Sequence, residues 1–277
     1  MSGPGSGARH AGAAAGWKRV GLPAVLALPL LLFLAVPVMV LVSRSTPAMV
    51  LGELDNRETR SAIVLSVVSS TMALGATIVF GTPLAYWLSR SRSRAAGIVE
   101  TLVDLPTVLP PSVAGVALLL TLGRNGPIGA WLHGAGIEVA FTPAAVVLAQ
   151  VFVASPYYVR SARAGFASVG TDLREAAIID GASGWRMLYR VLIPLASRSL
   201  GAGAAMCWSR AIGEFGATII FAGNLPGLTQ TMPLAVYLGF ENGLDRALVL
   251  STVLIGLSLL VLATIRVAGW RTADSDV

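Results

Sequence analysis

A chain of 277 residues that is 55% hydrophobic and only 12% charged does not have the composition of a soluble globular protein. Its mean hydropathy of +0.75 is typical of an integral membrane protein. The net charge of +6 does not indicate nucleic-acid binding, because the basic residues cluster in turns between apolar stretches, where they orient a membrane protein.

The first apolar stretch predicts a membrane span close to the N-terminus. Residues 1–16 are mostly Gly, Ala and Ser and are predicted to form a disordered tail. Residues 22–42 are 21 uncharged residues, which matches the length of about 20 that a helix needs to cross a bilayer. A signal peptide is the alternative, but this stretch is long for one and no clean small-residue cleavage site follows it. Residues 17–60 are therefore predicted to hold a retained span and its outer connection.

Five further apolar stretches predict five more spans, and thus an all-α, polytopic membrane protein with six transmembrane helices. They are residues 61–88, 105–122, 142–158, 199–222 and 247–267. Gly81 and Pro83 allow a kink near the end of the second span.

The third span opens with the proline-rich sequence LPTVLPPSVAG, residues 105–115. Pro106, Pro110 and Pro111 should prevent a regular helix there, and broken backbone at membrane depth is tolerated only inside protein or along a water-filled path. Pro110 and Pro111 are therefore candidates for the translocation path. The alternative is that the prolines lie at the membrane interface, before the helix begins.

A polar segment, residues 172–194, separates the fourth span from the fifth and is called the elbow below. Asp172 and Glu175 have the spacing of a capping box, and Gly181 can supply the left-handed residue that ends a short helix. Ser183 can cap a second short helix, which should not run past Pro194. The arginines of this segment exclude it from hydrocarbon, so a helix-turn-helix at a membrane face is predicted.

Two charged residues lie within the fifth span. Arg210 and Glu214 are four residues apart and should share one helical face. Charges in a membrane helix normally face the protein interior or an aqueous path, so both residues are path candidates; the alternative is a purely structural ion pair. Gly213 and Gly216 fit the small-residue pattern of closely packed membrane helices.

Basic residues predict the orientation of the chain. Counted in alternate connections, 14 Arg and Lys residues fall on the side of the termini and the elbow, and five fall on the other side. The positive-inside rule therefore places both termini and the elbow in the cytoplasm.

The elbow resembles the signature loop of ABC importer permeases. The family pattern of Glu-Ala-Ala, a glycine and a final aliphatic-x-aliphatic-Pro is met here by EAAIIDGASGWRMLYRVLIP, residues 175–194, with intact spacing. The resemblance implies the type I ABC importer permease fold. It also implies that the elbow is the coupling helix that docks on a cytoplasmic ATPase subunit, with the matching residues Glu175, Ala176, Ala177, Gly181 and Pro194.

Three further motifs resemble the molybdate branch of the oxyanion permeases: LPTVLPPSVAG, GEFGATIIFAGN (213–224) and TMPLAVY (231–237). Residues 61–267 would form the permease core and residues 268–277 a cytoplasmic tail. The resemblance implies a cell-membrane homodimer that works with two ATP-binding subunits and an extracytoplasmic oxyanion-binding protein. Tungstate and sulfate or thiosulfate stay open as alternative substrates.

No enzymatic site is indicated by the sequence itself. The single lysine, Lys18, follows Gly16-Trp17 in the N-terminal region and does not end a nucleotide-binding glycine-rich loop. ATP would thus be used by the partner subunit, with no cofactor or metal bound by this chain. His133 has no metal-ligand spacing and is expected to be a solvated loop residue, and the single cysteine, Cys207, is expected to act as a small hydrophobe. A stand-alone secondary anion transporter remains the alternative from a different class.

Overall fold

A computed structural model describes residues 11–271 of the chain, and within them it contains helices and no strand. The predicted all-α fold is confirmed. The chain divides into two compact units, Met1–Pro47 and Ala48–Val277. The first unit contains α1 (Ala11–Ser43), whose segment Val25–Ser43 has a mean hydropathy of 2.9 and is long enough to span a bilayer. The helix starts at Ala11, so only residues 1–10 of the predicted tail lie outside the described residues.

The second unit begins with two helices joined at Asn56. α2 (Pro47–Asp55) is followed by α3 (Arg57–Arg90), which has the length and hydropathy of a span. Asn56 caps α3 because its side-chain oxygen accepts a hydrogen bond of 2.9 Å from the Glu58 amide. Pro83 lies inside α3, as predicted. The buried face of α3 consists of small residues, which let membrane helices approach closely.

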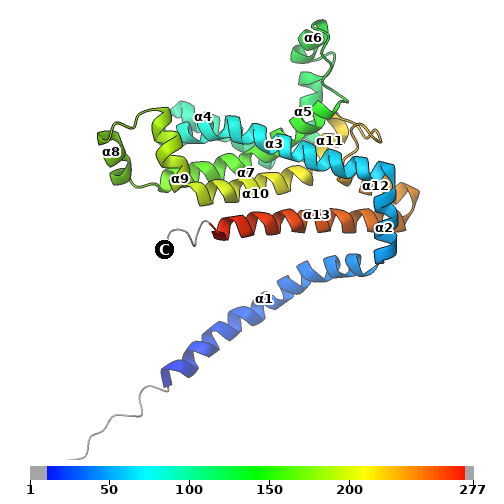
Figure 1. Cartoon of the computed structure of the whole chain (residues 1–277), viewed down its shortest axis with the longest axis horizontal. Coiled ribbons are helices and arrows are strands. Elements are labelled where there is room, and N and C mark those ends of the chain that lie inside the picture. Colours follow the sequence, from blue (N-terminus) through cyan, green and yellow to red (C-terminus); the bar gives the residue numbers. More distant parts are fainter. Residues whose placement is uncertain (1–10, 272–277) are drawn as a thin grey trace, which may run out of the picture. The chain divides into compact units, whose positions relative to one another are not determined.

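α3 packs against α7 (Pro143–Ser168) and α10 (Ser197–Ile212), and Figure 1 shows the three helices side by side. α7 continues ten residues beyond the predicted end of the fourth span at Tyr158. α7 and α10 lie so close that a Cβ added at Gly165 would come within 2.6 Å of Ser199 Cβ. The Ser161 hydroxyl also donates a hydrogen bond of 2.7 Å to the Ser199 carbonyl oxygen across this contact.

The predicted third span is a bent pair of helices. α4 (Arg94–Val108) and α5 (Pro111–Leu122) meet at an angle of 117°, and α6 (Pro127–Gly134) follows. Pro110 and Pro111 stand at the break, as expected. Pro106 does not interrupt the helix, because it lies inside α4, which ends two residues later at Val108 with Leu109 as its C-cap.

The predicted fifth span is not one helix. α10 ends at Ile212, and a short helix, α11 (Gly216–Phe221), begins after three residues. α12 (Met232–Asn242) and α13 (Leu244–Arg271) complete the described chain. Of the described helices, two meet the length and composition of a span alone, and two bent pairs do so together. The count of six spans is therefore not confirmed.

Candidate functional site

The elbow begins with α8 (Thr171–Ile179), which ends as predicted at Gly181. Gly181 has a φ of +80°, and two hydrogen bonds of 2.9 Å close the turn: its amide bonds to the Ile178 carbonyl and the Ala182 amide to the Ala177 carbonyl. This is a Schellman motif, in which a left-handed residue satisfies the last carbonyls of a helix. The predicted capping box is wrong, since the helix cap is Gly170 and Asp172 already lies in the first turn.

The second half of the elbow contains a π-helical turn, η1 (Met187–Leu192), followed by the single turn α9 (Ile193–Leu195). Met187, Leu188 and Leu192 are all at most 2% exposed and belong to the largest core cluster. The helix passes Pro194 by one residue and then bends by 79° into α10. π-Helical turns are rare and concentrate at functional positions of helices.

Part of the elbow surface is apolar and exposed. Glu175 and Ala176 are exposed, whereas Ala177 packs against the core cluster. Ile179 is 86% exposed and Trp185 is 64% exposed, and Trp185 stacks on Tyr189 with ring centroids 5.7 Å apart. An apolar surface of this kind beside exposed charges is typical of a docking site for another protein.

Ion pairs hold α7, the helix that leads into the elbow, to α4. Arg160 Nε lies 2.5 Å from Asp104 Oδ1, and Arg163 pairs with Glu100, so α7 is held to α4 at two successive turns. The hydrogen bond to Asp104 raises the pKa of the Arg160 guanidinium above its usual value. Arg174 of α8 donates to the Phe166 carbonyl oxygen of α7. Movement of the elbow should therefore be passed to α4 and α7.

The two broken helices meet at the opposite side of α7, where the LPTVLPPSVAG and GEFGATIIFAGN sequences pack together. A Cβ added at Gly115 would lie 2.8 Å from the Ala217 carbonyl oxygen, and one added at Gly216 would lie 2.7 Å from Pro111 Cβ. Pro110 is the N-cap residue of α5, next to this contact. Gly216 thus has the predicted packing role. Gly213 does not, since its only neighbour within 4 Å is the Ser209 oxygen of its own helix.

Arg210 and Glu214 form an ion pair at the break, with Arg210 Nη1 2.6 Å from Glu214 Oε2. Glu214 is 1% exposed, while the Arg210 side chain is 27% exposed. The second oxygen of Glu214 accepts a hydrogen bond of 2.7 Å from the Ala217 amide, so this side chain caps α11 from the break. The predicted pair exists, although its acidic partner lies beyond the end of α10 and not on the same helix.

The segment after α5 also contains polar contacts that were not predicted from the sequence. His133 is not a solitary loop residue: it lies on α6, its Nε2 accepts from Arg124 Nε at 3.2 Å, and its Nδ1 is 3.1 Å from Glu138 Oε1. Among the described residues, no group of three or more His, Cys, Asp and Glu could hold a metal ion.

Gln150 is a further polar residue that the sequence analysis passed over. It is 0% exposed on α7, and neither its amide nitrogen nor its amide oxygen has a hydrogen-bond partner among the described residues. The one feature of the sequence that could have indicated this buried residue is that its amide stands alone within the apolar run VVLAQVFVA, residues 146–154.

Comparison with known proteins assigns the fold and the family. Residues 77–269 match the family described as binding-protein-dependent transport system inner membrane component. The chain is 35% identical to the probable transport system permease protein NifC of Clostridium pasteurianum, over 91% of this chain and 89% of that protein. It is 37% identical to the molybdenum transport system permease protein ModB of Mycobacterium tuberculosis, over 87% of this chain and 90% of that protein.

Solved structures show the same fold at low identity. A chain of a bacterial ABC transporter that imports the acidic polysaccharide alginate superposes with a TM-score of 0.68 at 15% identity, covering 92% of this chain and 96% of that one. A chain of the MetNI methionine ABC transporter gives a TM-score of 0.54 at 19% identity, covering 79% and 94%. The fold is that of type I ABC importer permeases, and the chain belongs to the family of inner-membrane components of binding-protein-dependent transport systems.

Proposed function

We propose that this protein is the permease subunit of an ATP-driven importer and that it carries an oxyanion, molybdate, across the cell membrane. The observation that carries the proposal is the elbow, in which the residues of the permease signature end a short helix at Gly181 and leave Glu175 and Trp185 exposed. An exposed segment that is hydrogen-bonded to α7 through Arg174, while α7 is held to α4 by ion pairs, suits a mechanical connection to another subunit.

The substrate assignment rests on the relatives. Two of them, from Mycobacterium tuberculosis and Escherichia coli, are named molybdenum transport system permease proteins. A probable sulfate transport permease of Chlorokybus atmophyticus is 34% identical to this chain, so sulfate or thiosulfate stays an alternative, as does tungstate.

An energy source is required by the charge of such a substrate. Moving a dianion into a cell with an interior potential of about −100 mV costs about 4.6 kcal/mol, or about 2.3 kcal/mol per charge. A passive pore would lose the anion. The ATP for the reaction would be bound by a partner, and this chain would bind no cofactor.

The proposed assembly is a homodimer of this chain with two ATP-binding subunits and an extracytoplasmic oxyanion-binding protein. Support for the last partner comes from the alginate transporter, which was solved in complex with a periplasmic protein. The termini and the elbow would be cytoplasmic. The core would be residues 61–267, preceded by the first span within residues 17–60 and followed by a tail, residues 268–277.

Two groups of residues have proposed roles. Glu175, Ala176, Ala177, Gly181 and Pro194 would shape the surface that docks on the ATPase. Arg210, Glu214, Pro110 and Pro111 would mark the path, because they lie at two helix breaks whose helices pack on each other. Selectivity would belong to the binding protein, since a permease path that bound the anion tightly would trap it.

The test is ATP-dependent uptake of radiolabelled molybdate by vesicles that contain the permease, its ATPase and its binding protein. Uptake should need all three, and excess tungstate and sulfate should be compared as competitors. Glu175→Arg should abolish coupling of ATP hydrolysis to uptake while the protein still inserts. The matched control is Glu241→Arg, which reverses an exposed charge near the C-terminal end of α12.

Two results would overturn the proposal in different ways. Accumulation by the permease alone, without the ATPase, would favour the secondary transporter. Normal coupling in the Glu175→Arg variant would remove the elbow from the docking surface. Uptake of sulfate but not molybdate would change only the substrate.

A further inference from the structure

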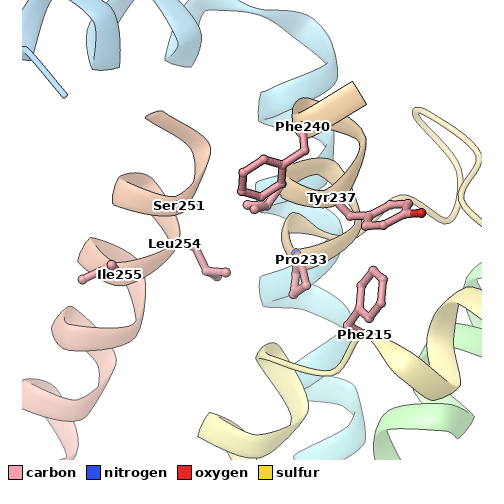
Figure 2. Close-up of a pocket in the computed structure, with 8 residues that line it drawn as sticks. Phe215, Pro233, Tyr237, Phe240, Ser251, Leu254 and Ile255 are labelled. Carbon is pink, nitrogen blue, oxygen red and sulfur yellow. The ribbon is translucent and has the colours of Figure 1, made fainter. Parts of the chain in front are cut away.

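An apolar groove opens beside the helix break that contains Glu214. It has a volume of about 330 Å³ and lies between α12, α13 and the residue that follows Glu214. It is lined by Phe215, by residues of α12 that include Pro233, Tyr237 and Phe240, and by Ser251 and Leu254 of α13 (Figure 2). The hydroxyl of Ser251 is already bonded to the Ala247 carbonyl oxygen at 2.7 Å, so the lining offers water almost nothing to bind.

Two aromatic rings face each other in this groove. The rings of Phe215 and Tyr237 have centroids 5.4 Å apart and planes inclined by 50° (Figure 2). Tilted rings at this distance attract each other beyond the effect of burial alone. Phe215 comes from the break between α10 and α11, whereas Tyr237 comes from α12. The ring contact therefore joins two elements that can move separately.

The backbone around Phe215 is suited to movement. Phe215 has φ −123° and ψ −54°, outside the helical region, and a Cβ added at Gly213 would meet only the Ser209 carbonyl oxygen, at 3.6 Å. Between them, Glu214 is held by Arg210 and by the Ala217 amide. A shift of Arg210 or Glu214 would thus displace the Phe215 ring directly.

We propose that Phe215 and Tyr237 form a hydrophobic gate of the anion path, closed while the two rings touch and opened when the break between α10 and α11 moves. The proposal rests on the proposed function, because it places the gate next to Arg210 and Glu214 as path residues. An apolar constriction blocks an ion by excluding the water that the ion must keep, without any charge of its own. A dianion is the substrate that such a barrier stops best.

The test uses vesicles that contain the permease with its ATPase, loaded with radiolabelled molybdate and given no ATP. Efflux should be slow for the unchanged protein. Phe215→Ala and Tyr237→Ala should each raise it by roughly three- to tenfold, as expected for loss of one aromatic contact. The double variant should leak little more than either single one, because both remove the same contact.

Phe240→Ala is the matched control, since Phe240 lines the same groove from α12 but forms no ring contact with Phe215. Its efflux should stay at the level of the unchanged protein. Tyr237→Phe keeps the ring and should also remain closed. The gate is refuted if neither single variant leaks, or if Phe240→Ala leaks as much, which would indicate general loosening of the groove.

The experiment distinguishes an error in the gate assignment from an error in the proposed function. If the unchanged complex accumulates molybdate with ATP and the Phe215→Ala complex does not leak, the gate assignment alone is wrong. If the unchanged complex shows no ATP-driven accumulation of any oxyanion, the proposed function is wrong, whatever the variants do.

Discussion

At the scale of single residues, the ion pair of Arg210 and Glu214 explains how a charge can lie in the middle of an apolar stretch. Glu214 is almost fully buried, and both of its carboxylate oxygens have partners, since one contacts Arg210 and the other accepts from the Ala217 amide at the start of α11. The positive charge of Arg210 is therefore largely balanced in this state. An anion that passes would meet a nearly neutral pair, which agrees with a path that binds weakly.

The ion pair predicts how single and double substitutions of Arg210 and Glu214 should change the free energy of unfolding. Arg210→Met should lower the free energy of unfolding by about 2–3 kcal/mol, somewhat less than for a fully buried pair because Arg210 is partly exposed. Arg210→Met combined with Glu214→Gln should recover part of this loss, since no buried charge is then left without a partner. Thermal unfolding in detergent measures both. Equal losses in the single and the double variant would contradict the pairing.

Replacing the buried Gln150 with an apolar residue should stabilise the protein. Both polar atoms of its buried amide lack a partner among the described residues, and such groups cost about 1–3 kcal/mol. Gln150→Leu has nearly the same volume and should raise the melting temperature. The control is Gln230→Leu, because Gln230 is also buried but donates 3.0 Å to Asn224 Oδ1 and should be destabilised by the change. A lower melting temperature in both variants would show that Gln150 is hydrogen-bonded in solution.

At the scale of elements, the sequence predicted the helix ends that local chemistry determines. Gly181 ends α8 and Pro110 with Pro111 separates α4 from α5, because a left-handed residue and a missing amide act within a single turn. The break after Ile212 was not predicted. It depends on Glu214, whose carboxylate caps α11 in place of helix continuation, while the flanking Gly213 and Gly216, which disfavour a helix, were interpreted only as packing residues. The π-helical turn was not predicted either. Its residues Met187 and Leu192 pack into the core, and such contacts with distant residues leave no local signal in the sequence.

The crossing of α5 and α11 predicts which glycines tolerate a methyl group. Gly115→Ala should destabilise the protein by about 1–3 kcal/mol, because the new Cβ would lie 2.8 Å from a backbone oxygen of α11 that cannot easily move. Gly75→Ala is the control: nothing lies within 4 Å of that site, so the substitution should be neutral or slightly stabilising in a helix. The measurement is the melting temperature of the two variants in the same detergent. Similar values would exclude a close contact between the two broken helices.

At the scale of the whole molecule, arginines near both ends of the second unit are paired with carboxylates. Figure 1 shows α8 at one end and the start of α13 at the other. At the start of α13, Arg246 lies 3.1 Å from Glu53 and 3.2 Å from Glu58. Burial lowers the pKa of Arg246, but the two carboxylates outweigh burial and raise it, so the ion pairs persist at neutral pH. Arg246 is one of the five basic residues on this side, and the positive-inside rule counts it whether or not it has carboxylate partners.

That orientation predicts the labelling of two single cysteines. Ser183 of the elbow and Asp245 at the start of α13 are both exposed, so each can be replaced by cysteine without disturbing the core. The native Cys207 is 0% exposed and should give little background with a membrane-impermeant maleimide. In intact cells, Asp245→Cys should react and Ser183→Cys should react only after the membrane is made permeable. The two variants control for each other, since the opposite result would place the elbow outside, where no ATP-binding subunit could reach it, and would refute the coupling role.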